Sequence, residues 1–188
     1  MSEAKILTLA EMRDVYNKRM PEDFPRSEIK PWFTIEKLYN AGDYFGAGVV
    51  SDTRLISYAF IVKRRDVSHV LLDYLAVAED LRDEGFGTET LRYLKETLDT
   101  DGILIETEDA DLASTDAELK KRNRRNSFYA CSGAEKTGIK SRVYGVDYDI
   151  FNIPVGKSTD ADECRKSLET LYRYMIPGIR NILHVKIR

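Results

Sequence analysis

The sequence predicts an α/β protein built on one mixed β-sheet, and three observations support this prediction. Three β-rich runs lie close together between residues 44 and 77, and further β-rich runs follow residue 102. Stretches whose apolar residues recur at helical spacing lie before, between and after these runs. The chain has 188 residues, of which 43% are hydrophobic. That is enough to bury the core of one domain, and it disfavours disorder and a coiled-coil rod.

The first half of the chain is predicted to contain two helices and most of the sheet. Met12, Val15 and Tyr16 show the i, i+3, i+4 spacing of an amphipathic helix, and Pro21 is expected to break it. Only two residues, 52–53, separate the second and third strands, which predicts a hairpin. The predicted elements are a strand at 5–9, a helix that ends at Pro21, a helix at 29–40, and strands at 44–51, 54–64 and 69–77.

The second half alternates helices with strands and ends in a helix and a tail. The predicted elements are a helix at 88–98, a strand at 103–106, a charged helix at 117–132, a strand pair at 138–144 and 146–153, and a helix at 161–175. Residues 179–188 are expected to be a strand or a docked extension. The resulting order is β-α-α-β-β-β-α-β-α-β-β with an extra C-terminal helix and tail. We therefore expect one domain over residues 1–155, with a helical extension over 156–188 packed on it.

Charge and cysteine content disfavour several classes of protein. The 29 Lys and Arg against 32 Asp and Glu give a net charge of −3, whereas nucleic-acid-binding domains usually show a basic excess. Two cysteines without a CxxC pair make no disulfide framework, and two distant histidines, His69 and His184, show no metal-ligand spacing. No signal-peptide pattern is visible, and the longest nearly apolar run, 55–62, is too short to span a bilayer. We expect a cytoplasmic protein with no metal, membrane or nucleic-acid partner. The sequence does not determine the oligomeric state and leaves a homodimer open.

Residues 82–88 form the most informative stretch of the chain. A buried strand ends at Val77, and a short loop then brings an arginine and two glycines to the start of a helix. Glycine lets a ligand approach the backbone, and the unpaired amides of a helix start favour an anion, so the loop predicts a diphosphate site. A dinucleotide fingerprint would need a third glycine where the chain has Thr90. The candidate contacts are Leu75, Ala76, Val77, Arg82, Asp83, Glu84, Gly85, Phe86, Gly87 and Thr88.

The pattern Arg82-x-x-Gly85-x-Gly87 after Leu-Ala-Val resembles the acyl-CoA pyrophosphate loop of the GNAT superfamily of N-acetyltransferases. The segment 127–133, Ser-Phe-Tyr-Ala-Cys-Ser-Gly, is similar to that family's FYxxxGF motif, although Ala134 replaces the final aromatic residue. The family's preceding Asn is replaced by Arg122, and Asn126 is the displaced candidate for contact with the cofactor. The resemblance covers residues 5–155 in element order, and its motifs cover 71–133. It implies a GNAT-like fold in which acetyl-CoA binds in a splayed opening beside the third central strand and an amine attacks directly, without an acyl-enzyme.

Acetyl transfer to an amine benefits from a general base, because an alkyl amine with a pKa of about 10.4 is almost entirely protonated at neutral pH. Asp73 is the only carboxylate in its apolar strand, where burial is costly without a purpose. The resemblance supports it as base or amine anchor; the alternative is a structural Asp. Glu106 is the reserve candidate, with a solvated acidic loop as its alternative.

The resemblance places Tyr129 near the departing sulfur as a hydrogen-bond donor, the alternative being a core aromatic residue. Cys131 points elsewhere on the helix and is expected to pack. The basic stretch 120–125 is expected to be a solvated helix face, one or two members of which reach the cofactor.

The acidic run after residue 105 hints at a cationic acceptor, such as a polyamine, an aminoglycoside-like amine or a protein N-terminus. A non-catalytic acyl-CoA-binding or interaction module on the same fold is the alternative function.

Overall fold

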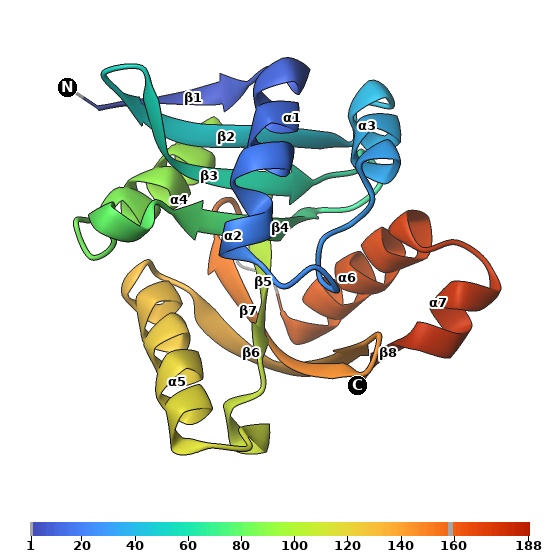
Figure 1. The fold of residues 1–188 in the computed structure, drawn as a ribbon. Coiled ribbons are helices and arrows are strands. Elements are labelled where there is room, and N and C mark those ends of the chain that lie inside the picture. Colours follow the sequence, from blue (N-terminus) through green and yellow to red (C-terminus); the bar gives the residue numbers. More distant parts are fainter. Residues whose placement is uncertain (1, 158–159) are drawn as a thin grey trace. The chain divides into compact units, whose positions relative to one another are not determined.

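The computed structural model describes residues 2–157 and 160–188, and it confirms the predicted mixed α/β fold (Figure 1). The chain forms two compact units. The first comprises Met1–Val62 with Asp73–Thr97, and the second comprises Lys63–Leu72 with Leu98–Arg188. Strand β4 (His69–Val77) contributes its first four residues to the second unit and the remainder to the first.

The first unit contains the strand order β1-β2-β3-β4 of the sheet, in which β1 is antiparallel to β2 and β2 is antiparallel to β3. Its elements in chain order are β1 (Glu3–Leu7), α1 (Leu9–Lys18), α2 (Met20–Asp23), α3 (Trp32–Asn40), β2 (Tyr44–Ser51), β3 (Arg54–Val62), the end of β4, the 3-10 turn η1 (Glu79–Leu81) and α4 (Phe86–Thr97).

Prolines and a capping box set the helix boundaries of this unit. Thr8 accepts a hydrogen bond from the amide of Glu11, whose carboxylate in turn accepts from the Thr8 amide, so α1 begins with a reciprocal cap. The prediction that Pro21 ends this helix is wrong, because α1 ends at Lys18 and Pro21 lies in the first turn of α2, where a missing amide costs nothing. The helix expected at 29–40 begins only at Trp32, since Pro31 disfavours helical backbone at the residue before it.

Helices α1 and α4 cover opposite faces of the first sheet, as Figure 1 shows. A Cβ built on Gly46 of β2 would lie 2.9 Å from Met12 of α1 and 3.2 Å from Phe60 of β3, so α1 packs closely on that face. On the other face, the hydroxyls of Ser57 and Thr90 lie 2.6 Å apart and join β3 to α4. Side chains alternate between faces along a strand, so Ser57 and Phe60 belong to opposite faces, as these contacts require.

The second unit has the strand order β4-β5-β7-β6-β8. The start of β4 runs parallel to β5, with Leu72 opposite Ile105 as the last pair, and the other neighbours are antiparallel. The tail predicted as a strand or docked extension forms a short helix and an edge strand. Its remaining elements are β5 (Gly102–Glu108), the 3-10 turn η2 (Ala110–Leu112), α5 (Asp116–Cys131), β6 (Glu135–Val143), β7 (Val146–Pro154), α6 (Ala161–Met175), α7 (Ile179–His184) and β8 (Val185–Ile187).

Helix α6 packs its apolar stripe, including Leu168 and Leu171, into the core of this unit. It also covers His69, which is fully buried and whose Nδ1 lies 3.1 Å from the Ser167 hydroxyl. By contrast, the expectation that Cys131 packs inside is wrong: it is exposed at the end of α5, a helix with one buried residue. Among the described residues, no helix combines the length and apolarity needed to cross a membrane.

Candidate active site

The predicted phosphate loop lies in the first unit, between β4 and α4. Residues Leu75–Val77 of β4 are partly exposed, although the start of that strand is buried. The loop from Arg82 to Gly85 is exposed, and Asp83 and Gly85 have positive φ angles of 68° and 88°. These angles turn the chain sharply into α4, which begins at Phe86.

The loop geometry fits an anion. The first amides of an α-helix have no partner within the helix, and here they follow directly on the exposed turn. A Cβ built on Gly85 would meet no atom within 4 Å, so the space on the side-chain position of this glycine is open. Gly87 is buried in the first turn of α4. Thr90 occupies the position at which a dinucleotide fingerprint would have its third glycine, and its hydroxyl is hydrogen-bonded to that of Ser57. The loop therefore offers backbone donors to a phosphate from a rigidly packed helix.

Asp73 lies in the first unit, in a network of fixed partners. Its side chain is 6% exposed, and its Oδ1 is 2.5 Å from the ammonium of Lys30. Its Oδ2 accepts a hydrogen bond of 2.7 Å from Tyr44. Burial, and next the charge of Asp73, raise the pKa of Tyr44, so Tyr44 remains a neutral donor. Asp73 thus has the buried setting expected of it, with both oxygens engaged.

Tyr74, the neighbour of Asp73, fixes the segment that carries Lys30. The Tyr74 hydroxyl accepts a 2.9 Å hydrogen bond from the Lys30 amide and donates one of 2.8 Å to the Glu28 carbonyl. The ammonium of Lys30 lies 5.4 Å from the centre of the Tyr74 ring. Burial raises the pKa of Tyr74 as well. The connection between α2 and α3 is therefore tied to β4 at the position of Asp73.

Glu106, the reserve carboxylate, lies in the second unit and is also engaged. Its Oε1 accepts a hydrogen bond of 2.8 Å from Ser141 of β6, and its Oε2 accepts one from Tyr172 of α6. The acidic run after it is not merely a solvated loop. Asp109 is buried and ion-paired to Lys140, and the Asp109 carbonyl accepts a 2.6 Å hydrogen bond from Arg122.

Tyr129 and Asn126 lie on α5 in the second unit. Tyr129 is 7% exposed, and burial raises its pKa to about 12. The Oδ1 of Asn126 is buried and has no hydrogen-bond partner among the residues that the structure describes. A buried carbonyl oxygen without a donor is costly, and a ligand with an amide or hydroxyl would satisfy it. Part of the predicted basic face is occupied by ion pairs, since Arg122 and Arg125 each lie 3.4 Å from Glu108.

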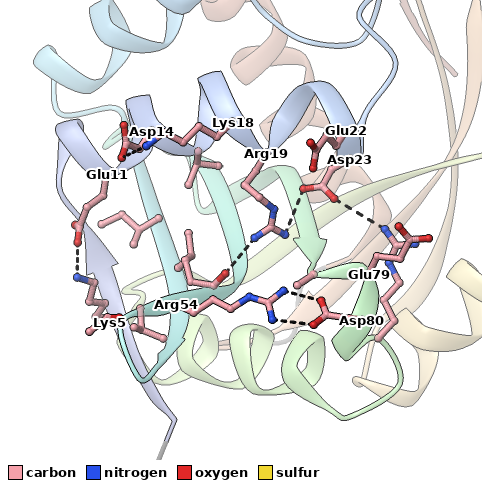
Figure 2. A pocket seen from close by; sticks show the side chains of 17 residues that line it. Lys5, Glu11, Asp14, Lys18, Arg19, Glu22, Asp23, Arg54, Glu79 and Asp80 are labelled. Carbon is pink, nitrogen blue, oxygen red and sulfur yellow. Dashed lines mark hydrogen bonds and ion pairs between the residues drawn. The ribbon is translucent and has the colours of Figure 1, made fainter.

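A cavity of about 760 Å³ lies in the first unit, beside the start of the phosphate loop. Figure 2 shows ion pairs along its walls: Arg54 with Asp80 at 2.6 Å, and Arg19 with Asp23 at 3.5 Å. Arg82 is the only predicted site residue that lines it, 3.9 Å from Asp23. Six carboxylates and five cationic groups line the cavity, so its charge does not favour a polyanion. The loop amides, and not this cavity, therefore remain the candidate anion site.

Sequence reasoning missed the partners of the two candidate carboxylates. Lys30 lies in a loop 43 positions before Asp73, and Tyr172 lies 66 positions after Glu106. One signal was available: a carboxylate buried in an apolar strand requires a cation or several donors nearby. That rule predicts a partner for Asp73 but does not say which of the 29 basic residues it is.

Comparisons with known proteins agree with this fold. The family model described as "Acetyltransferase (GNAT) family" matches residues 9–117, more than half of the chain. No curated protein sequence matches the chain. Three solved structures illustrate the fold that it shares, although identities this low are evidence for the fold alone.

The ribosomal-protein-S18-alanine N-acetyltransferase from Escherichia coli is 18% identical, with a TM-score of 0.59 over 85% of this chain and 97% of that one. An aminoglycoside 6′-N-acetyltransferase complexed with coenzyme A is 16% identical, with a TM-score of 0.61 over 84% and 99%. A GNAT-family protein from Bacteroides thetaiotaomicron is 17% identical, with a TM-score of 0.68 over 94% and 99%. The matching family model covers more than half of the chain, and the mixed sheet agrees with it, so the chain belongs to the GNAT family of acetyltransferases.

Proposed function

We propose that this protein transfers an acetyl group from acetyl-CoA to an amine acceptor by direct attack in a ternary complex. The observation that carries the proposal is the exposed turn at Gly85, which has open space at its Cβ position and lies directly before the first residues of α4. The membership of the GNAT family makes acetyl-CoA the expected occupant of such a loop. Acetyl-CoA supplies the activated thioester, and the protein's own residues bind and orient the reactants.

The residues proposed to hold acetyl-CoA divide by chemistry. The amides of 83–88 bind the diphosphate, and the exposed guanidinium of Arg82 adds a positive charge. The partly exposed backbone of Leu75, Ala76 and Val77 offers hydrogen-bonding groups to the amides of the pantetheine arm. Asn126, whose Oδ1 has no donor among the residues that the structure describes, is suited to accept a hydrogen bond from an amide or hydroxyl.

Asp73 is proposed to receive the acceptor amine. Its Oδ1 already binds one ammonium, that of Lys30, which demonstrates that the position stabilises a cation. A carboxylate in this position anchors the acceptor as its ammonium and accepts the proton that must leave before attack. Glu106 is the second candidate for the base, held by β6 and α6 through Ser141 and Tyr172. Through Tyr172, the C-terminal extension would then orient a catalytic group.

Tyr129 is proposed to stabilise the departing thiolate by a hydrogen bond. With its pKa raised to about 12, Tyr129 is a much weaker acid than a thiol. Full proton transfer to a thiolate of pKa about 8.5 would run uphill by roughly 3.5 units, or about 5 kcal/mol. A neutral phenol that donates a hydrogen bond to the developing charge avoids this cost.

The test is a screen of amine acceptors that follows the release of free CoA thiol from acetyl-CoA. The panel contains polyamines, aminoglycosides and peptides with free N-termini, and each acceptor is run with and without protein. Thiol release that depends on both protein and acceptor supports the proposal. Tight binding of acetyl-CoA without transfer to any amine would instead favour the non-catalytic acyl-CoA-binding module.

A further inference from the structure

Lys30 places a primary amine of the chain itself at the position proposed for the acceptor. Its ammonium lies 2.5 Å from Oδ1 of Asp73. The Lys30 side chain is 24% exposed, and that of Asp73 is almost completely buried. Ordering a long lysine side chain in this way costs conformational entropy. Lys30 and Asp73 together form an amine and a carboxylate in direct contact, the arrangement that acetylation of an external amine requires.

The backbone around Lys30 holds this amine close to the strand proposed to bind the thioester. The Lys30 amide is bonded to the Tyr74 hydroxyl, which in turn is bonded to the Glu28 carbonyl, so the segment is fixed to β4. Asp73 and Leu75 point to the same face of the strand, about 7 Å apart along it at roughly 3.3 Å per residue. The flexible four-carbon stem of Lys30 can span that distance by changing rotamers while its backbone stays fixed.

We propose that Lys30 is an intramolecular acetyl acceptor, so that the protein acetylates itself at this residue when acetyl-CoA is bound and no external amine is present. The inference rests on the proposed function. Asp73 takes one proton from the Lys30 ammonium, and the neutral amine attacks the thioester carbonyl. The N–C bond forms, the C–S bond breaks, and the second amine proton leaves with the thiolate as CoA thiol. Asp73 then returns its proton to water, which leaves acetyl-lysine, CoA and one released proton.

The experiment incubates the purified wild-type protein with acetyl-CoA alone and measures acetylation of each lysine by peptide mass spectrometry over time. Lys18 is the matched control, because it is also paired to a carboxylate, Asp14 at 2.9 Å, but is far more exposed, at 71%. Indiscriminate chemical acetylation would modify Lys18 faster. We expect Lys30 to react at least about tenfold faster than Lys18, because its attack is intramolecular. The rate should not depend on protein concentration, and Lys30→Arg, which keeps the charge, should remove the acetyl group from this peptide.

Acetyl-CoA binding and transfer to amines are measured on the same preparation, so that the two proposals fail separately. If the protein binds acetyl-CoA and acetylates an external amine but Lys30 reacts no faster than Lys18, then Lys30 is a structural ion-pair partner and this inference is wrong. If the protein neither binds acetyl-CoA nor modifies Lys30, the proposed function fails, and the inference fails with it. A Lys30 rate that doubles when the protein concentration doubles would also overturn the intramolecular step.

Discussion

Replacing Gly85 by alanine should weaken CoA binding strongly while it lowers the stability of the protein only slightly. Gly85 has a φ of 88°, and a Cβ there would meet nothing within 4 Å. The methyl group therefore costs only left-handed strain, roughly 1–2 kcal/mol. Alanine also reduces the conformational freedom of the unfolded chain, which offsets about 0.4–1 kcal/mol of this loss of stability. The net loss is about 1 kcal/mol, which lowers the Tm by roughly 2–4 °C in a protein of this size.

The effect on CoA binding should be much larger, because the new methyl occupies the space in which the loop amides meet a phosphate. Loss of one charge-assisted hydrogen bond costs about 1.5–3 kcal/mol, which weakens binding about 10- to 150-fold. Gly42→Ala is the matched control, since Gly42 has a φ of 78° and equally open surroundings but lies after α3. Calorimetric titration with CoA and thermal melts measure both quantities for the three proteins. If Gly85→Ala binds CoA as tightly as the wild type, or if Gly42→Ala weakens binding equally, the loop assignment is wrong.

Three other substitutions test the proposed role of Tyr129, the ion pair of Asp73 with Lys30, and the buried histidine His69. Tyr129→Phe should lower kcat about 10- to 1000-fold in steady-state assays while the Kd for CoA stays constant. An unchanged kcat would indicate that Tyr129 has only a structural role in the core. Asp73→Asn leaves the partly buried Lys30 ammonium without its charge partner. It should lower the free energy of unfolding by about 2–3 kcal/mol and the Tm by roughly 4–12 °C. A variant that melts at the wild-type temperature would contradict a stabilising ion pair. Burial lowers the pKa of His69 in the folded state, so the unfolded chain binds a proton more readily. The contribution of His69 to stability is therefore present above the ordinary histidine pKa of about 6.5, and it is lost as the pH falls below that pKa. Melts from pH 8 to about 5 should show this loss, and His69→Gln should remove it; an identical pH profile in the variant would contradict it.

The sequence was sufficient to predict the fold class and the β2–β3 hairpin, because local rules govern these features. Alternation and helical spacing identify strands and helices, whereas the anion site at the start of α4 stays a prediction. Boundaries that depend on proline were less predictable. Pro21 could either end one helix or begin another, and the structure has it in the first turn of α2.

Contacts between distant residues could not be predicted in the same way. The buried setting of Asp73 followed from its apolar strand, but its bonds to Lys30 and Tyr44 depend on how the α2–α3 segment and β2 pack around β4. The tie between Glu106 and Tyr172 likewise needs α6, a helix that the motifs did not cover. Cys131 was assigned to the core because of its residue type, yet α5 leaves it in solvent. The type of a residue sets its average burial, and the packing around it decides the burial of that particular side chain.

The most direct test of acetyl transfer follows the acetyl group itself. The protein is incubated with acetyl-CoA carrying a deuterated acetyl group and with an acceptor identified by thiol release, and the labelled amine and the free CoA are quantified together by mass spectrometry. Direct transfer predicts one labelled amide for each CoA released. It also predicts that Gly85→Ala reduces both in proportion while Gly42→Ala changes neither. CoA release without labelled amide would indicate thioester hydrolysis, and it would contradict the assignment of this protein as an amine acetyltransferase.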